Sequence, residues 1–263
     1  MPIVFAAITP HSPLLIPSVG KENLSLFALT LNAYKTLADD LYASQADTVI
    51  IISPHGAMSE KQFSINFAHD FLINFDEFGD FETKMELPGD FVLATKLKES
   101  IGHDADLRFV NEPKLDHGTS VPLFLLAKNL PQLKIIPIYY SAQSLAEHFK
   151  FGQILKRKIN SETSKKIAII ASGDLSHSLN KKSPAGYSPK GKKFDQKLIE
   201  SLSKNNVSDI LALDPGLVSA ANECGLKSIM ILLGILDGMK HDPEVLSYEF
   251  PFGIGHLAVR FRI

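Results

Sequence analysis

Residues 166–172 read KIAIIAS, a short run that is apolar at almost every position. Three other runs share this character: Ile3–Ile8, Thr48–Ser53 and Lys134–Ser141. Their hydrophobicity is nearly continuous rather than alternating, which is typical of strands that are buried on both faces of a parallel sheet. We therefore expect these four runs to form the centre of a mostly parallel sheet.

The segments between these runs predict helices. Lys21–Ala43 places its apolar residues close to a 3.6-residue period, and the long apolar segment Ala220–Met239 ends near a Gly stop signal. The other predicted helices are Asp90–Ser100, Val121–Asn129, Ser144–Lys158 and Phe194–Lys204, and Ile254–Ile263 alternates like a final strand. The alternation of strands and helices predicts a single α/β domain over residues 1–263, an α/β/α sandwich with helices on both faces of a mostly parallel central sheet.

The composition is that of a globular protein, with 263 residues of which 45% are hydrophobic and 21% charged. The 27 basic and 29 acidic residues give a formal net charge of −2, which argues against a nucleic-acid or polybasic membrane-binding surface. Apolar runs stay shorter than the roughly 18–20 residues that span a bilayer, and the first residues lack a basic leader. The single Cys224 excludes an intramolecular disulfide. We expect a soluble, cytoplasmic protein that binds neither nucleic acid nor membrane.

Three of the nine histidines directly follow predicted strands. His11 follows Ile3–Ile8, His55 follows Thr48–Ser53, and His177 follows the run at 166–172. Ligands bind at the carboxyl ends of the strands in open α/β sheets, and the neighbouring Pro and Gly residues restrict these loops enough to aim an imidazole. A fourth histidine, His117, precedes a predicted helix. These four histidines are the candidates for a functional site.

Other features have more than one interpretation. The polar loop at 180–193, rich in Gly and Pro, is either a lid over a site or a solvated connection. The six phenylalanines of Phe63–Glu86 are expected mainly in the core or at a subunit contact, and the alternative is the wall of a substrate pocket. His256 lies between small residues in the terminal strand and could line a pocket. Surface positions are expected for the remaining histidines, which are His69, His103, His148 and His241.

Histidines from two separate strand ends indicate a metal site, which needs a third ligand. Glu223 is the candidate because it precedes the strongly apolar segment Leu226–Leu236, where a buried charge must be paired or coordinated. The alternative is a first-turn glutamate that the helix dipole stabilises. Two histidines and one carboxylate form the facial triad of non-haem Fe(II) oxygenases, which leaves positions open for substrate and O₂.

Five short motifs occur in a characteristic order: PHSP at 10–13, SPHG at 53–56, DHG at 116–118, SGDLSH at 172–177 and NECG at 222–225. In this set the chain resembles the class III extradiol ring-cleavage dioxygenases, the family of the catalytic LigB subunit of protocatechuate 4,5-dioxygenase, over essentially its whole length. The segments FAAITPH at 5–11 and LSYEFPFG at 246–253 look closest to a narrower branch. That branch comprises the LigB-like proteins associated with the AmmeMemoRadiSam system, which are related to Memo.

The resemblance implies that His11, His55 and Glu223 hold Fe(II), that His177 is the catalytic acid/base, and that His117 contacts substrate or oxygen. The implied reaction opens a small aromatic substrate, a catechol or an aminophenol, with O₂. Memo-type proteins present a Cys before the Gly of the corresponding turn, so Cys224 competes with Glu223 as the third ligand. Zinc or copper favours the thiolate, whereas Fe(II) dioxygenase chemistry favours the carboxylate.

The resemblance also bears on partners and on competing functions. A homodimer is the default expectation, and some relatives work with a small α-type subunit. Two alternatives to ring cleavage remain, a Zn-dependent hydrolase that uses the same histidines and a Memo-like metal-binding regulatory protein without turnover. A Ser-His-Asp hydrolase is disfavoured because the sequence has no GxSxG motif, and a dinucleotide enzyme because no GxGxxG follows the first strand.

Overall fold

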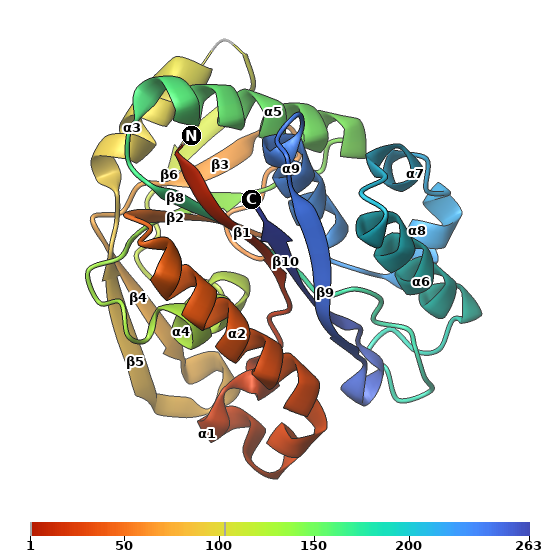
Figure 1. Ribbon diagram of the computed structural model, residues 1–263. Coiled ribbons are helices and arrows are strands. Elements are labelled where there is room, and N and C mark those ends of the chain that lie inside the picture. Colours follow the sequence, from red (N-terminus) through yellow and green to blue (C-terminus); the bar gives the residue numbers. More distant parts are fainter. Residues whose placement is uncertain (1, 103) are drawn as a thin grey trace.

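The computed structural model describes residues 2–102 and 104–263. An eight-stranded sheet lies at its centre, with strand order β6-β3-β7-β2-β8-β1-β10-β9 (Figure 1). Its strands are β1 (Ile3–Thr9), β2 (Thr48–Ser53), β3 (Phe63–Asn66), β6 (Leu107–Val110), β7 (Lys134–Tyr139), β8 (Ile167–Ser172), β9 (Asp242–Glu249) and β10 (His256–Arg262). A separate antiparallel hairpin is formed by β4 (Asp70–Phe75) and β5 (Asp80–Pro88).

The four apolar runs form the middle of the sheet, where β7, β2, β8 and β1 are parallel, and this confirms the predicted fold class. Every residue of β2 and β8 is buried, because helices cover both faces. The register pairs Thr9 with Ser172 and Ile52 with Ala171. Strands β1, β2 and β8 therefore end at nearly the same level, and the loops that follow them start side by side.

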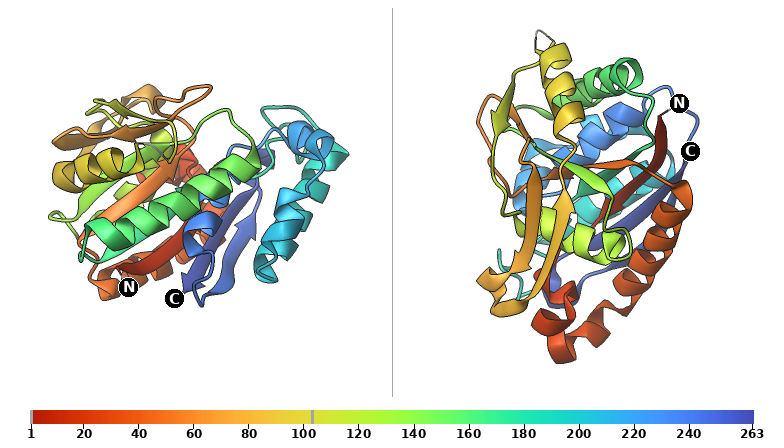
Figure 2. Two further views of the ribbon diagram at one scale, coloured as in Figure 1. Left: turned by 90° about the horizontal axis from the view of Figure 1, so that it is seen from above. Right: turned by 90° about the vertical axis from the view of Figure 1, so that its left-hand side faces the viewer.

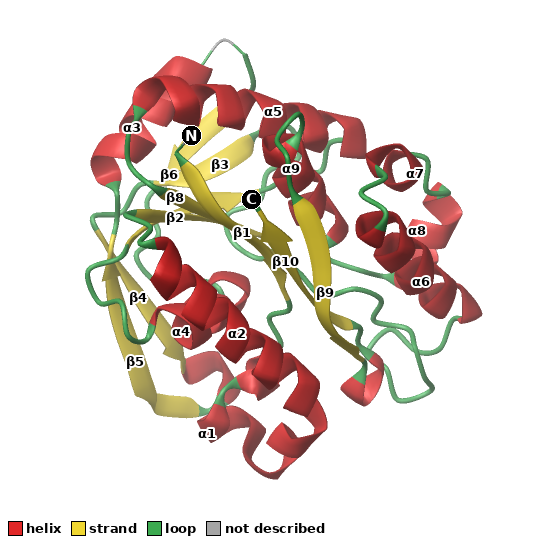
Figure 3. Ribbon diagram, viewed as in Figure 1, coloured by secondary structure: helices red, strands yellow, loops and turns green. Residues whose placement is uncertain are grey.

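Helices cover the two faces of the sheet (Figures 2 and 3). The α-helices are α1 (Pro17–Gly20), α2 (Ala28–Ser44), α3 (Phe91–Ile101), α4 (His117–Ala127), α5 (Leu145–Glu162), α6 (Pro189–Ser203), α7 (Val207–Leu211), α8 (Pro215–Ala221) and α9 (Leu226–Leu236). Short 3₁₀ helices are η1 (Pro13–Leu15), η2 (Lys21–Phe27), η3 (Asp76–Phe78) and η4 (Pro251–Gly253). Helices α3, α5, α6 and α9 share one buried apolar cluster, whereas α2, α4 and the β4–β5 hairpin share the other.

The segment predicted as one helix, Ala220–Met239, is broken. Helix α8 ends at Ala221 and α9 begins at Leu226, and Asn222 between them adopts the left-handed conformation with φ of 52°. The amides of Cys224 and Gly225 donate to the carbonyl of Asp174 instead of to a preceding helical turn. This tertiary contact interrupts the helix and carries residues 222–225 to the end of β8.

Two smaller expectations also differ from the structure, and a third, for the phenylalanines, is confirmed for three of the six residues. Helix α6 begins at Pro189, because Ser188 caps it, so the predicted loop at 180–193 is shorter at its end. His148 is fully buried rather than at the surface, and its Nδ1 lies 2.7 Å from the carbonyl oxygen of Ser144. Among the six phenylalanines, three are buried in the core, but Phe81 is 70% exposed. His103 lies outside the described residues.

Within the described residues, the helices are too short or too polar to span a lipid bilayer.

Candidate metal centre

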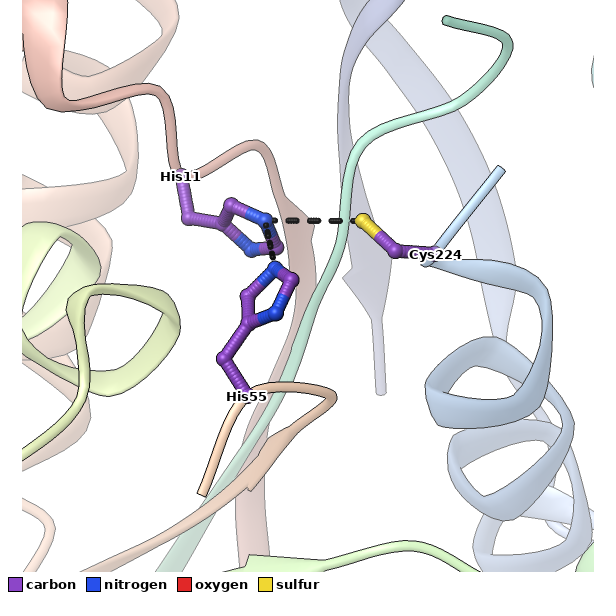
Figure 4. A group of neighbouring side chains, drawn as sticks. All are labelled: His11, His55 and Cys224. Carbon is purple, nitrogen blue, oxygen red and sulfur yellow. Dashed lines mark hydrogen bonds between the residues drawn. The ribbon is translucent and has the colours of Figure 1, made fainter. Parts of the chain in front are cut away.

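Two histidines converge where the central strands end. His11 lies two residues after β1 and His55 two residues after β2. Their Nε2 atoms are 3.0 Å apart, and Sγ of Cys224 lies 3.5 Å from Nε2 of His11 (Figure 4). The three donor atoms lie within 4.8 Å of one another, and the set combines the loops after β1 and β2 with the turn between α8 and α9.

The tautomer of His11 is set by a hydrogen bond on the far side of its ring. Nδ1 lies 2.9 Å from Oγ of Ser172, and this hydroxyl donates its own proton to the carbonyl oxygen of Gly118. Because a hydroxyl has a single proton, Oγ must accept at His11, so the ring hydrogen lies on Nδ1. The lone pair of His11 therefore lies on Nε2, which faces His55 and Cys224, as a metal ligand requires.

Asp174 connects these donors, although the sequence did not single it out. Its buried carboxylate accepts the backbone N–H of His11 at 3.1 Å, and its backbone N–H donates to Sγ of Cys224 at 3.3 Å. Nδ1 of His256 lies 3.1 Å from the same carboxylate. His256 is 1% exposed, so its imidazole supports Asp174 from a buried position. Burial raises the pKa of Asp174, but the adjacent His11 and His256 outweigh burial and hold that pKa well below its usual range.

The two imidazoles are neutral at pH 7. Desolvation lowers the pKa of His11 to about 3, and desolvation together with the neighbouring His117 lowers the pKa of His55 to about 4. A neutral imidazole offers its lone pair without first losing a proton. Burial and the adjacent Asp174 raise the pKa of the Cys224 thiol, so this donor must lose a proton when it binds a cation.

The donor set fits a single metal ion. An ion about 2.0–2.1 Å from each nitrogen and about 2.3 Å from the sulfur separates its ligands by roughly 3–3.6 Å in tetrahedral geometry. The distance of 3.0 Å between the two Nε2 atoms and that of 3.5 Å between Nε2 of His11 and Sγ of Cys224 match this requirement. The third pair, His55 and Cys224, has its donor atoms within 4.8 Å of each other, so a small side-chain rotation at either residue would bring all three donors to one ion. Two imidazoles and one thiol are donors that borderline-soft ions such as zinc and iron accept.

Glu223 is placed differently from the sequence prediction. Its carboxylate accepts the backbone N–H of Leu226 at 2.6 Å and thereby satisfies an N–H at the start of α9. Burial raises the pKa of Glu223 to about 7. The structure therefore brings the thiol of Cys224, and not the adjacent carboxylate, to His11 and His55. Glu223 lies two residues before Gly225, the N-cap of α9, so it is not the first-turn glutamate of the alternative interpretation either.

The two remaining candidate histidines flank the donors. His117, the first residue of α4, stacks on His55 with ring centroids 4.3 Å apart and lies edge-on to His11 at 5.3 Å. His177 is close enough that its charge would lower the pKa of both His11 and His55. Within residues 2–102 and 104–263, buried Nδ1 of His177 has no hydrogen-bond partner. Its acid/base role stays a prediction.

An open cleft of about 520 Å³ reaches this group of side chains. It is lined by His55, Gly56, Ala57, Glu77, Glu112, Lys114, Leu115, Asp116 and His117. Its volume falls in the range of about 300–1,000 Å³ that small-molecule sites occupy. A small molecule in the cleft would therefore contact one of the three donor residues and the histidine that stacks on it.

Three comparisons place these features among known proteins. The family model described as the catalytic LigB subunit of aromatic ring-opening dioxygenase matches residues 5–261. Protein CA_C1420 of Clostridium acetobutylicum is 33% identical over 259 residues, which cover 95% of this chain and 55% of that protein. The chain thus spans about half the length of this curated relative. The crystal structure of the uncharacterized protein JW3007 from Escherichia coli K12 superposes with a TM-score of 0.70 at 18% identity and covers 98% of this chain and 99% of that one, which shows a shared fold.

Proposed function

The chain belongs to the LigB family of catalytic subunits of aromatic ring-opening dioxygenases, and from this membership we propose that it opens a catechol- or aminophenol-type ring with O₂. The observation that carries the proposal is the convergence of His11, His55 and Cys224 on one point at the carboxyl ends of the strands. An open cleft beside this point can admit a small aromatic substrate.

In this proposal Nε2 of His11, Nε2 of His55 and Sγ of Cys224 hold one metal ion. When bound, the metal supplies Lewis acidity and the open coordination positions that substrate and O₂ chemistry needs. We propose Fe(II), because Zn²⁺ has no redox chemistry, although the same nitrogen and sulfur donors also accept Zn²⁺. The buried carboxylate of Asp174 orients two of the ligands through its contacts with His11 and Cys224.

The proposed work of the protein is to position the ring and to move protons. Among the described residues, Nδ1 of His177 has no hydrogen-bond partner, and in this proposal His177 accepts the proton that a substrate hydroxyl gives up. The loop that carries His177 is held by its own backbone N–H, which donates to the carbonyl of Ala221 at 2.9 Å. His117 stacks on His55 at the cleft wall and can donate a hydrogen bond to a substrate oxygen.

A second candidate is a metal-binding protein that performs no ring cleavage, either a Memo-like regulatory protein or a zinc hydrolase. The thiol of Cys224 favours this second candidate. Two imidazoles with a thiolate are a donor set that suits zinc, whereas the facial triad of Fe(II) oxygenases has a carboxylate in the place of the thiolate. The two candidates differ in whether oxygen is consumed.

Metal analysis of anaerobically purified protein, combined with O₂ uptake, tests the proposal. Iron-loaded protein should consume O₂ when it is given catechol or ortho-aminophenol, and Cys224→Ala protein treated in the same way should not. Stoichiometric zinc with no O₂ uptake by the iron-loaded protein would instead support the second candidate.

A further inference from the structure

One peptide bond beside the metal centre is held at both of its polar atoms. The carbonyl oxygen of Pro10 accepts the hydroxyl of Tyr34, and the N–H of His11 donates to the carboxylate of Asp174 at 3.1 Å. Tyr34 is 2% exposed and Asp174 is 3% exposed. In this trans peptide the C=O and the N–H point in opposite directions from one rigid plane. Two buried partners on opposite sides of the plane therefore fix its rotation.

Apolar packing does not account for the hydroxyl of Tyr34. The residue lies in α2, and its ring belongs to the buried cluster that also contains Phe27, Leu37 and Leu41. A phenylalanine would cover the same apolar surface without the cost of burying a polar group. The hydroxyl donates to the carbonyl of Pro10, the residue that precedes His11. Helix α2 thus contributes, besides an apolar face, one polar atom that reaches the metal centre through the main chain.

The position of His11 matters more for the donor set than that of either other donor. Its Nε2 lies 3.0 Å from Nε2 of His55 and 3.5 Å from Sγ of Cys224, and Figure 4 shows it in contact with both. A shift of the His11 main chain would change both distances at once. Side chains that bind a metal must be held within about 0.5 Å of their productive positions.

The remaining contact of His11 acts on its ring and not on its main chain. Nδ1 lies 2.9 Å from Oγ of Ser172, which sets the tautomer but leaves the position of Cα to the backbone. The backbone is held by Asp174 from the loop after β8 and, through Pro10, by Tyr34 from α2. Without the hydroxyl of Tyr34 the peptide would keep a partner on one side only.

We propose that Tyr34 is a positioning residue of the metal centre, whose hydroxyl places His11 for metal binding by holding the carbonyl of Pro10. The inference rests on the part of the proposed function that puts a metal ion on His11, His55 and Cys224, and it does not depend on ring cleavage. Tyr34 lies outside the donor set and acts through the main chain.

Metal binding by Tyr34→Phe tests the inference, because this change removes the oxygen and keeps the buried ring. Zinc affinity, measured by competition with a chelator, should fall by at least about tenfold, the lower end of the loss for a group that orients a ligand. The Co²⁺-loaded variant should have altered d–d absorption bands, which report ligand geometry, and should keep the charge-transfer band of the Cys224 thiolate. Tyr34→Met, which also lacks the hydroxyl and adapts to the same space, replaces the first variant if that one does not fold.

Two controls in the same helix separate positioning from stability. Tyr42→Phe removes a hydroxyl from a side chain that is 60% exposed and should leave zinc affinity within about twofold of the parent. Leu41→Val removes a methylene from a buried side chain two turns after Tyr34, so it should lower the unfolding temperature but preserve zinc affinity and the cobalt spectrum. Thermal unfolding of the metal-free proteins verifies that each variant is folded.

The outcomes distinguish the inference from the proposed function. If Tyr34→Phe binds zinc as tightly as the parent and has the same cobalt spectrum, Tyr34 does not position His11, and the metal centre stands. If Leu41→Val loses as much zinc affinity as Tyr34→Phe, the loss follows stability and the inference is wrong. If the parent binds neither zinc nor cobalt, the proposed function is wrong and the inference fails with it.

Discussion

The backbones of Gly173 and Gly225 are in direct contact: a Cβ atom added to Gly173 would lie 2.1 Å from Cα of Gly225. Gly173 directly follows β8, and Gly225 directly precedes α9. Side chains larger than hydrogen cannot be accommodated between the two loops. The contact therefore seats the turn at 222–225 against the strand end, and this position brings the Cys224 thiol to His11.

We predict that Gly173→Ala weakens metal binding as well as folding. The added methyl group must push the turn away, at a cost of about 1–3 kcal/mol in the free energy of unfolding. Because the turn carries Cys224, zinc affinity measured by competition with a chelator should fall by at least about tenfold, comparable to the loss of an outer-shell contact.

Gly216→Ala is the matched control. An added Cβ at Gly216, in α8, meets its nearest atom, the side-chain Oδ1 of Asp214, at 3.3 Å, so alanine requires that side chain to shift by only a few tenths of an ångström. The control should keep zinc affinity and unfold at a free energy within about 1 kcal/mol of the parent. Equal zinc affinity in Gly173→Ala and the parent would show that the close contact does not position the thiol.

A second prediction separates the two adjacent candidates for the third ligand. Cys224→Ala should reduce zinc affinity by more than about 100-fold, beyond the loss expected for an outer-shell residue. Glu223→Gln should leave zinc affinity within about threefold of the parent, because the glutamine oxygen can still accept the N–H of Leu226. The reverse pattern would make the carboxylate the ligand.

The third prediction concerns the division of roles among the histidines. His177→Ala should retain metal but lose turnover by roughly 10²–10⁴-fold, the usual contribution of a positioned acid/base. His11→Ala should lose metal and turnover together, since its Nε2 faces the other donors. His69→Ala, at a side chain that is 88% exposed, is the control and should change neither. Loss of metal in His177→Ala equal to that in His11→Ala would contradict the assignment.

The centre of the fold is predictable from sequence because its strands are buried on both faces and hence nearly continuous in hydrophobicity. Strands β3 and β6 are not predicted from the sequence, because each has four residues, too few to establish a pattern of hydrophobicity. The break between α8 and α9 was missed for a different reason. It depends on the carbonyl of Asp174, which is 48 residues or more from that turn in sequence, so no local signal marks it.

Some residues of the candidate site are likewise predictable from the sequence, and others are not. His11 and His55 are predictable because they stand at equivalent positions after parallel strands. The third donor is not predictable from the sequence, because residues 223 and 224 are adjacent. The conformation of the turn decides which of the two side chains reaches His11. Asp174 lies within a motif that resembles the family, but its hydrogen bonds to His11 and His256 form only when three strand ends meet.

The last prediction concerns stability against pH through Asp195, which is fully buried and accepts the backbone N–H of Ser176 and the hydroxyl of Tyr248. Burial raises its pKa from 3.8 to about 6, so between these values the folded protein holds a proton that the unfolded chain has released. The contribution of Asp195 to the free energy of unfolding is therefore fully present below pH 3.8 and is lost as the pH rises to about 6. The loss amounts to up to about 3 kcal/mol, at 1.36 kcal/mol per pH unit. Urea unfolding of Asp195→Asn should lack this decline, whereas Asp209→Asn, at an exposed position of α7, should follow the parent. A parallel decline in parent and Asp195→Asn would mean that another group holds the proton.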